Sequence, residues 1–155
     1  MKRASVVLLF SILIRLSGSA QAPNVVSLAK VKTAALVVRA TSSVSCGDGS
    51  EGTCVRTDTD VIRNVTTIVD GTDLWQHFEK ADPTKADVIF EFTLRSAKST
   101  YGSVEFSVRD ADTNQILYTE SRSIVVLEND IARIVAHFLK VFEDAKKSPP
   151  NTKKH

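Results

Sequence analysis

Two runs of alternating apolar and polar residues constrain the fold of this chain more than any other feature. Every second side chain is apolar in residues 86–95, and the same holds in residues 103–110. Side chains of a strand alternate between its two faces, so this pattern predicts strands with one buried and one solvated face. Residues 96–102 join the two runs as a hairpin loop. A turn cluster, Asp110–Asn114, then leads into a third strand over residues 115–123.

A long amphipathic helix is predicted after the third strand. Residues 130–147 place apolar side chains at helical spacing, and Asn129 stands where a helix N-cap is expected. Asp130 at the amino end and two lysines at the carboxyl end suit the helix dipole. The prolines that follow end the helix, and residues 148–155 are expected to form a disordered basic tail.

The amino-terminal half predicts one more strand, with both of its faces covered. Five apolar residues in a row, Ala34–Val38, lie within residues 31–40, and such a run is typical of a strand at the centre of a sheet. Residues 58–70 are ambiguous, because their apolar side chains have helical spacing but many are β-branched, which slightly favours a strand. Residues 72–81 predict a short helix that the following Asp-Pro pair ends.

Together these elements predict an α+β domain over residues 23–147. We expect a mostly antiparallel sheet of four or five strands, with the long C-terminal helix packed on one face. A core of this size can support a single domain. The residues expected to be buried in it are Leu36, Val38, Val88, Phe90, Phe92, Leu94, Val104, Phe106, Val108, Ile131, Ile134, Val135, Phe138 and Phe142.

The first 22 residues have the three parts of a secretory signal peptide. Two basic residues give a positive start, Val6–Ile14 is an apolar run, and residues 17–22 are mostly small. Cleavage after Ala20 and cleavage after Ala22 both fit the small-residue rule. An uncleaved membrane anchor is the competing interpretation, although the apolar run is shorter than the roughly 20 residues that span a bilayer.

Removal of this segment would change the charge of the chain. The full sequence has 20 basic and 18 acidic residues, and the first 22 residues hold three basic residues and no acidic ones. The mature chain then carries 17 basic against 18 acidic side chains, a net charge of −1, which gives no argument for binding nucleic acid. We therefore expect a secreted or periplasmic protein with no membrane span after signal removal and no nucleic-acid partner.

Two cysteines, Cys46 and Cys54, bound a glycine-rich segment. An even number of cysteines in an exported chain indicates a disulfide, and three glycines among the seven residues between them let the chain turn back. Closing this loop would stabilise the fold by roughly 2–3 kcal/mol. A redox pair or two metal ligands are the alternatives, but the spacing is not Cys-x-x-Cys and no nearby histidine completes a zinc set. We expect a structural disulfide.

No catalytic, cofactor-binding or metal-binding motif stands out in the sequence. His77 and His137 lie on predicted helices, and no local spacing gives either of them a partner for general base catalysis. The solvated strand faces carry charged side chains that form either a solvated surface or a polar platform for a partner. These are Glu91, Arg95, Glu105 and Arg109, with Glu120 and Arg122 as candidates to join them.

The order of the predicted elements resembles that of a known family. The segments read VKTAALVV, then ADVIFEFTLR, VEFSVRDADTNQILYTES and NDIARIVAHFLKVFEDAKK. They are similar to small periplasmic α/β domains of the type found in the curli-channel assembly protein and at the amino end of TolB, whose hairpin turn reads Asp-x-x-Thr-Gly. This sequence differs in having Asn114 for the glycine and in the inserted loop between the cysteines. The resemblance implies an assembly or interaction role in a cell envelope and carries over no catalytic residue.

The sequence leaves two classes of function open. The first is a non-enzymatic secreted or periplasmic module that binds an envelope or extracellular protein, without a cofactor. The second is a small extracytoplasmic hydrolase whose site is assembled from distant residues. A deep polar pocket with a histidine or acid of shifted pKa would favour the hydrolase, whereas a flat sheet face would favour the binding module. The absence of a catalytic motif favours the first class.

Overall fold

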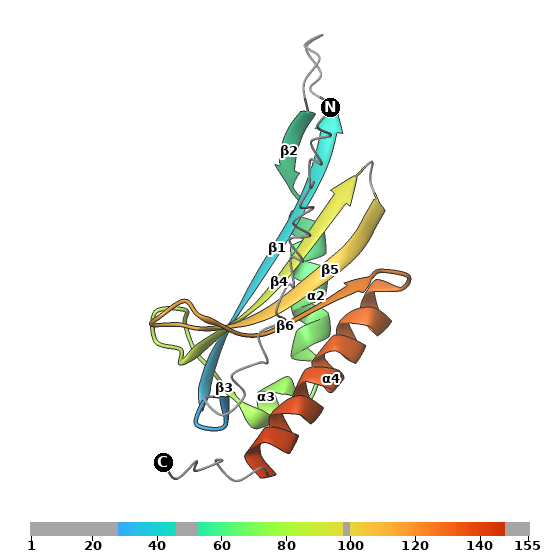
Figure 1. The fold of residues 1–155 in the computed structure, drawn as a ribbon. Helices are drawn as coiled ribbons and strands as arrows, with labels where there is room; N and C mark the ends of the chain where they lie inside the picture. Colours follow the sequence, from blue (N-terminus) through green and yellow to red (C-terminus); the bar gives the residue numbers. More distant parts are fainter. Residues whose placement is uncertain (1–27, 46–52, 98–99, 148–155) are drawn as a thin grey trace, which may run out of the picture.

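A mixed β-sheet with helices packed against one of its faces makes up the fold (Figure 1). The computed structural model describes residues 28–45, 53–97 and 100–147. The sheet has six strands, five of them in one continuous path and the sixth pairing beside it. The α+β class expected from the alternating runs and the long helix is therefore confirmed.

The main path of the sheet runs β2-β1-β4-β5-β6, and β3 pairs with the start of β1. The pairing of β1 with β4 is parallel, whereas the β1–β2, β4–β5 and β5–β6 pairings are antiparallel. A parallel pair needs a crossover connection, which the segment containing the first two helices supplies here. The elements in chain order are β1 (Thr33–Ser45), β2 (Thr53–Thr57), α2 (Thr59–Asp70), α3 (Leu74–His77), β3 (Glu79–Lys80), β4 (Val88–Ala97), β5 (Thr100–Asp110), β6 (Ile116–Ser123) and α4 (Leu127–Lys147).

Residues 58–70, for which the composition slightly favoured a strand, form helix α2. Its N-cap is Asp58, whose Oδ1 accepts a hydrogen bond from the backbone nitrogen of Val61 at 3.1 Å. Val65 and Val69 are fully buried on one side of the helix, which packs beside α4. The strand prediction was wrong because burial of an apolar stripe stabilises a helix more than β-branched residues weaken it.

The short helix expected over residues 72–81 is only four residues long. It ends at His77, because Phe78 adopts an extended conformation with φ −134° and ψ 139°. Glu79 and Lys80 then form β3 and pair with the first residues of β1. The second half of the predicted helix was therefore wrong: tertiary pairing with β1 extends the chain there.

The long C-terminal helix begins earlier than expected, at Leu127, and Asn129 is not its cap. Asp130 lies in the first turn of the helix, and its side chain reaches back to the residues before it. Its Oδ2 accepts hydrogen bonds from the backbone nitrogens of Val125 and Val126 at 2.8 and 3.0 Å. These bonds fix the loop that precedes the helix and hold the pKa of Asp130 below its ordinary value, against the effect of burial.

The turn between β5 and β6 is built as the sequence predicted. Asp110 Oδ1 accepts hydrogen bonds from the backbone nitrogens of Asp112 and Thr113, at 3.1 and 2.8 Å, and from Thr113 Oγ1 at 2.9 Å. Asn114 has a φ of 57°, in the left-handed region that asparagine adopts more readily than most residues. This conformation explains why asparagine can replace glycine at this turn.

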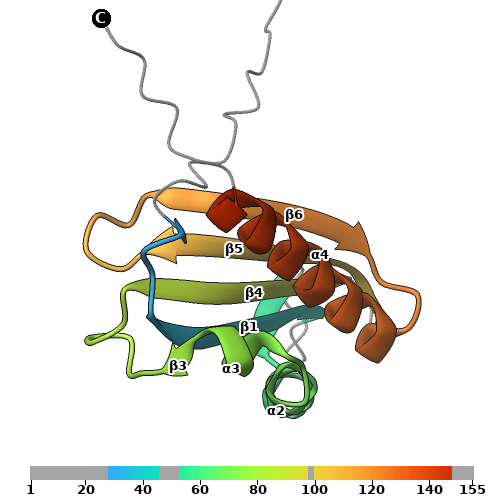
Figure 2. The ribbon, with the colours of Figure 1, turned by 90° about the horizontal axis from the view of Figure 1, so that it is seen from below.

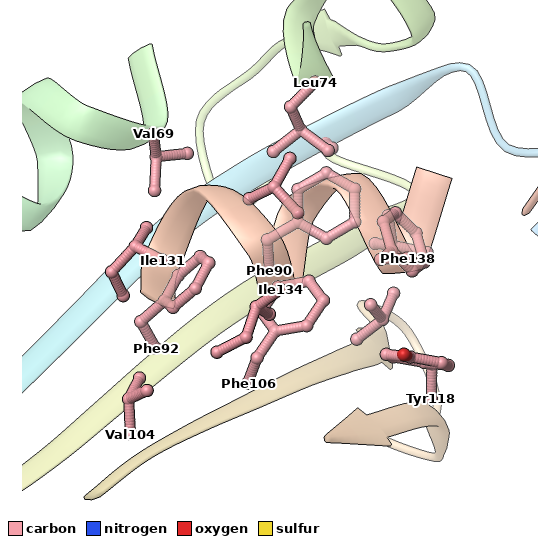
Figure 3. Packing of buried hydrophobic residues seen from close by; sticks show 14 of the residues in the cluster. Val69, Leu74, Phe90, Phe92, Val104, Phe106, Tyr118, Ile131, Ile134 and Phe138 are labelled. Carbon is pink, nitrogen blue, oxygen red and sulfur yellow. The ribbon is translucent and has the colours of Figure 1, made fainter. Parts of the chain in front are cut away.

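One hydrophobic core fills the space between the sheet and the helices (Figure 3). Phe138 of α4 lies at its centre. Its ring centroid is 5.3–6.2 Å from five other aromatic rings, which belong to Phe78, Phe90, Phe106, Tyr118 and Phe142. All the core residues expected from the sequence are buried except Leu36 and Val38, which pack against the core but are partly exposed.

Several predictions concern residues outside the described ranges. These are the signal peptide, the tail over 148–155 and one half of the cysteine pair, Cys46. Cys54 lies on β2, and its disulfide with Cys46 stays a prediction. In the ranges that the structure does describe, no helix combines the length and the apolar character needed to cross a membrane.

Candidate binding surfaces

The two faces of the sheet differ in character. The helices share one core with one face, and Figure 2 shows α3 and α4 lying over the strands on that side. Alternate residues of β1, β4 and β5 point to the other face, where no described helix lies. We call this the open sheet face and define it by its charged residues, Arg39, Glu91, Arg95, Glu105 and Arg109.

Glu91 lies at the centre of the open sheet face and is nevertheless only 7% exposed. Its Oε1 accepts a hydrogen bond from Arg39 Nε at 2.5 Å, and its Oε2 accepts one from Arg109 Nη2. The three residues belong to three adjacent strands, so they form a line across the sheet. A buried carboxylate is costly unless it is paired, and here an arginine on each side pairs it.

The two arginines keep hydrogen-bonding capacity beyond their contacts with Glu91. The Arg39 side chain is 66% exposed and that of Arg109 is 33% exposed. Arg109 Nη1 also donates to Asn114 Oδ1 at 3.4 Å, and its Nε is buried with no partner among the described groups. Because a guanidinium group has five N–H donors, donors remain on both side chains for an acceptor above the face.

The structure separates the charged residues that the sequence grouped together. Arg95 and Glu105 lie on the open sheet face, as expected. Glu120 and Arg122 do not, because they pair in register with Phe106 and Val104 and so share the helix-covered face. The charged residues of the open sheet face therefore belong to β1, β4 and β5.

Glu120 instead joins a cluster beneath α4. Its Oε1 accepts a hydrogen bond from Arg122 Nε at 2.6 Å, and its Oε2 accepts one from Tyr118 Oη at 2.7 Å. His137 Nδ1 lies 2.8 Å from the same Oε2 and 3.3 Å from Tyr118 Oη. His137 thus has a carboxylate partner, which lies 17 positions away on a different element and could not be recognised from local spacing.

The electrostatics of this cluster favour a structural role. Burial of Glu120 opposes its ionisation, but hydrogen bonds from His137, Arg122 and Tyr118 outweigh that effect and hold its pKa below the ordinary value. Burial and the bond to Glu120 raise the pKa of Tyr118 above its ordinary value. A carboxylate with a low pKa and both oxygens occupied is a poor general base.

The other predicted helical histidine has weaker contacts. His77 Nε2 lies 3.9 Å from Glu143 Oε1, and its ring meets the edge of the Phe142 ring at a centroid distance of 6.2 Å. These contacts tie α3 to the carboxyl-terminal part of α4. His77 and His137 lie on different helices and have different carboxylate partners, so the structure does not combine them into one site.

A cavity of about 650 Å³ opens at the edge of β1, between α2, α3 and residues 80–85. Its aromatic residue, Trp75, is already engaged: Nε1 donates to Asp70 Oδ1 at 3.1 Å, and Lys80 Nζ lies 4.8 Å from the ring centroid. Lys80 Nζ is also 2.6 Å from Asp70 Oδ1. No histidine lines this cavity. Within the described ranges, no group of three or more histidine, cysteine, aspartate or glutamate residues is placed to hold a metal ion.

Comparisons with known proteins find distant likenesses among solved structures. No family model matches the chain, and no curated protein matches it. Among solved structures, it is similar to the PelC dodecamer from Paraburkholderia phytofirmans in two crystal forms. The TM-scores are 0.42 and 0.41 at 11% sequence identity, covering 72% and 74% of this chain and 86% and 88% of the PelC chains. A likeness at this level carries no inference about function, which depends on the site itself.

Proposed function

We propose that this protein is a non-enzymatic secreted or periplasmic module that binds an envelope or extracellular protein through its open sheet face. The observation that carries the proposal is the line of Arg39, Glu91 and Arg109 across three adjacent strands. The hydrogen bonds to Glu91 restrain both arginine side chains before a partner binds, so less side-chain freedom is lost on binding.

The chemistry of the face favours a partner that presents carboxylates. Its charged residues are three arginines and two glutamates, and Glu91 is already occupied by two of the arginines. The remaining guanidinium donors suit carboxylate oxygens, which arginine binds with charge-assisted hydrogen bonds. A sheet face that presents polar side chains fits a protein surface better than a small molecule, which would need a concave pocket.

The hydrolase alternative receives less support from the geometry. The described histidine nearest to a carboxylate, His137, shares that carboxylate with Arg122 and Tyr118. The cavity at the edge of β1 has no histidine in its lining. The described residues therefore do not combine a free base, a nucleophile and a pocket, which hydrolysis requires.

Export is part of the proposal and has its own test. If the first 22 residues are a signal peptide, the exported protein begins at Gln21 or Pro23. Amino-terminal sequencing of protein recovered outside the cytoplasm would show which. An intact Met1 in the membrane fraction would instead support the uncleaved anchor.

Binding through the open sheet face is tested by capture from the native envelope fraction. Wild-type protein, Arg39→Gln and Arg95→Glu are compared, with Arg63→Glu as control because its side chain lies on α2 and is 78% exposed. We expect the wild type and the control to retain the same partner, and both face variants to lose most of it at unchanged circular dichroism. Equal retention by all four proteins, or no partner for the wild type, would refute the proposal.

A further inference from the structure

Strand β6 forms an edge of the sheet, with β5 on one side and no described strand on the other. The backbone nitrogen of Ile124 donates to the carbonyl oxygen of Gly102 at 3.1 Å, so residue 124 points toward β5. Peptide groups of successive residues in a strand point to alternate sides. The residues whose N–H and C=O groups face the open edge are therefore Thr119, Ser121 and Ser123, and no described group bonds to them.

Exposed apolar side chains gather at the two ends of this edge. Four large hydrophobic side chains are exposed among the described residues, and three of them flank or begin β6. Ile116 is 56% exposed, Val125 is 87% exposed and Val126 is 50% exposed. Single exposed apolar residues are ordinary, but three along one unpaired edge indicate a surface that a partner covers.

We propose that β6 pairs with β6 of a second copy of this chain, antiparallel and centred on Ser121, to give a dimer with one continuous sheet. A two-fold axis through the edge generates such a pair from identical strands. Edge-facing residues then lie opposite edge-facing residues, and roughly six backbone hydrogen bonds form between the copies. Both copies of α4 lie on the same side of the joined sheet.

The charges of β6 select this register and explain why the occupant is a second copy. Centring the pair on Glu120 would set two glutamates opposite each other, and centring it on Arg122 would oppose two arginines. Glu120 and Arg122 already form an ion pair within each chain. Centring the dimer on Ser121 sets Glu120 of each copy opposite Arg122 of the other, so the two ion pairs meet with opposite charges facing each other. Opposite charges across a strand pair stabilise it and like charges destabilise it. Of the three registers, only the one centred on Ser121 places opposite charges across from each other.

The remaining side chains of β6 are also compatible with the register centred on Ser121. On the open side of the sheet, Thr119 lies opposite Ser123 of the second copy, and neither is charged. At the ends of the pair, Ile116 of one copy approaches Val126 of the other, which would cover two of the exposed apolar side chains. Since one strand edge buries less area than a standard protein interface, we expect a dimer that dissociates on dilution.

Cysteine cross-linking of the full chain tests both the dimer and its register. At the centre of the pair, the two Cα atoms of residue 121 would lie about 5.5 Å apart, within the range that a disulfide spans. Residue 119 is the matched control. In the proposed register it lies opposite residue 123 of the second copy, so the two residues 119 are far from each other. We expect Ser121→Cys to give at least tenfold more covalent dimer than Thr119→Cys after mild oxidation, and the wild type to give none.

Sedimentation velocity over a concentration series supplies a second measurement. The wild type should shift from monomer to dimer as its concentration rises. Arg122→Glu should stay monomeric at unchanged circular dichroism, because two glutamates would then face each other across the pair. Equal cross-linking of the two cysteine variants, or a wild type that sediments as a monomer throughout, would overturn the proposal.

Discussion

Replacement of Phe138 by alanine should cost more stability than any single change on the surface. The side chain is fully buried in the middle of α4, and its ring contacts five other aromatic rings at centroid distances of 5.3–6.2 Å. Truncation of a buried phenylalanine costs about 3–5 kcal/mol. Aromatic pairs add about 0.5–1.5 kcal/mol beyond their buried area, which places this site at the upper end of that range.

The stability lost in Phe138→Ala is large relative to the free energy of unfolding of the whole domain. A domain of this size has a free energy of unfolding of roughly 5–15 kcal/mol, so Phe138→Ala should remove a third of it or more. We expect the urea midpoint to fall accordingly and the melting temperature to drop by about 10–20 °C. The neighbouring variant His137→Ala is the control, because its side chain is 51% exposed and Glu120 keeps Arg122 and Tyr118 as partners.

The expected cost of His137→Ala is under about 1 kcal/mol. Urea denaturation of both variants, fitted with a common slope, separates the two values. A loss below about 2 kcal/mol for Phe138→Ala would mean that the core around this ring collapses and refills the space. A large loss for His137→Ala would refute the interpretation of the Glu120 cluster as one in which the histidine is dispensable.

Three further predictions concern other parts of the fold. Non-reducing peptide mapping of the exported protein should show Cys46 linked to Cys54, and free alkylation of both thiols would contradict the expected oxidising compartment. The pKa of Asp130 is lowered by the amides it accepts from, so its contribution to stability is present above the unfolded-state pKa and is lost as pH falls through the lower folded-state value. The stability difference between wild type and Asp130→Asn should therefore shrink below about pH 4 in urea titrations, and a constant difference would contradict this. Asn114→Gly should be nearly neutral, whereas Asn114→Val should cost about 1–2 kcal/mol because of the positive φ, and equal thermal stability of the two would show that the turn relaxes.

Strands with one solvated face could be predicted well from the sequence. In the runs that became β4 and β5, the side chains at every second position are apolar, and the buried residues they predict are the ones that face the helices. The burial of α4 was predicted for the same reason, since its stripe repeats at the helical period. In these elements the local pattern and the tertiary environment agree.

The elements that were missed are those whose conformation depends on distant residues. α2 is helical because Val65 and Val69 pack in the core, and a two-residue strand such as β3 exists only because β1 lies beside it. The partner of His137 is on β6, and Glu91 is buried only because arginines of two other strands cover it. The resemblance to small periplasmic domains stays a prediction.

The parallel pairing of β1 with β4 has a consequence for the order of folding. Contacts between these strands join residues 54 positions apart, as in the hydrogen bond from the Thr33 nitrogen to Asp87 Oδ2, whereas the β4–β5 and β5–β6 pairings are local hairpins. Closing the long loop costs chain entropy before any of its contacts form. During synthesis, the apolar run of β1 therefore stays without its neighbouring strand until β4 has been synthesised. A chain truncated before residue 88 lacks β4 and should not form this sheet. In the full chain, we expect the carboxyl-terminal hairpins to form before β1 pairs with β4.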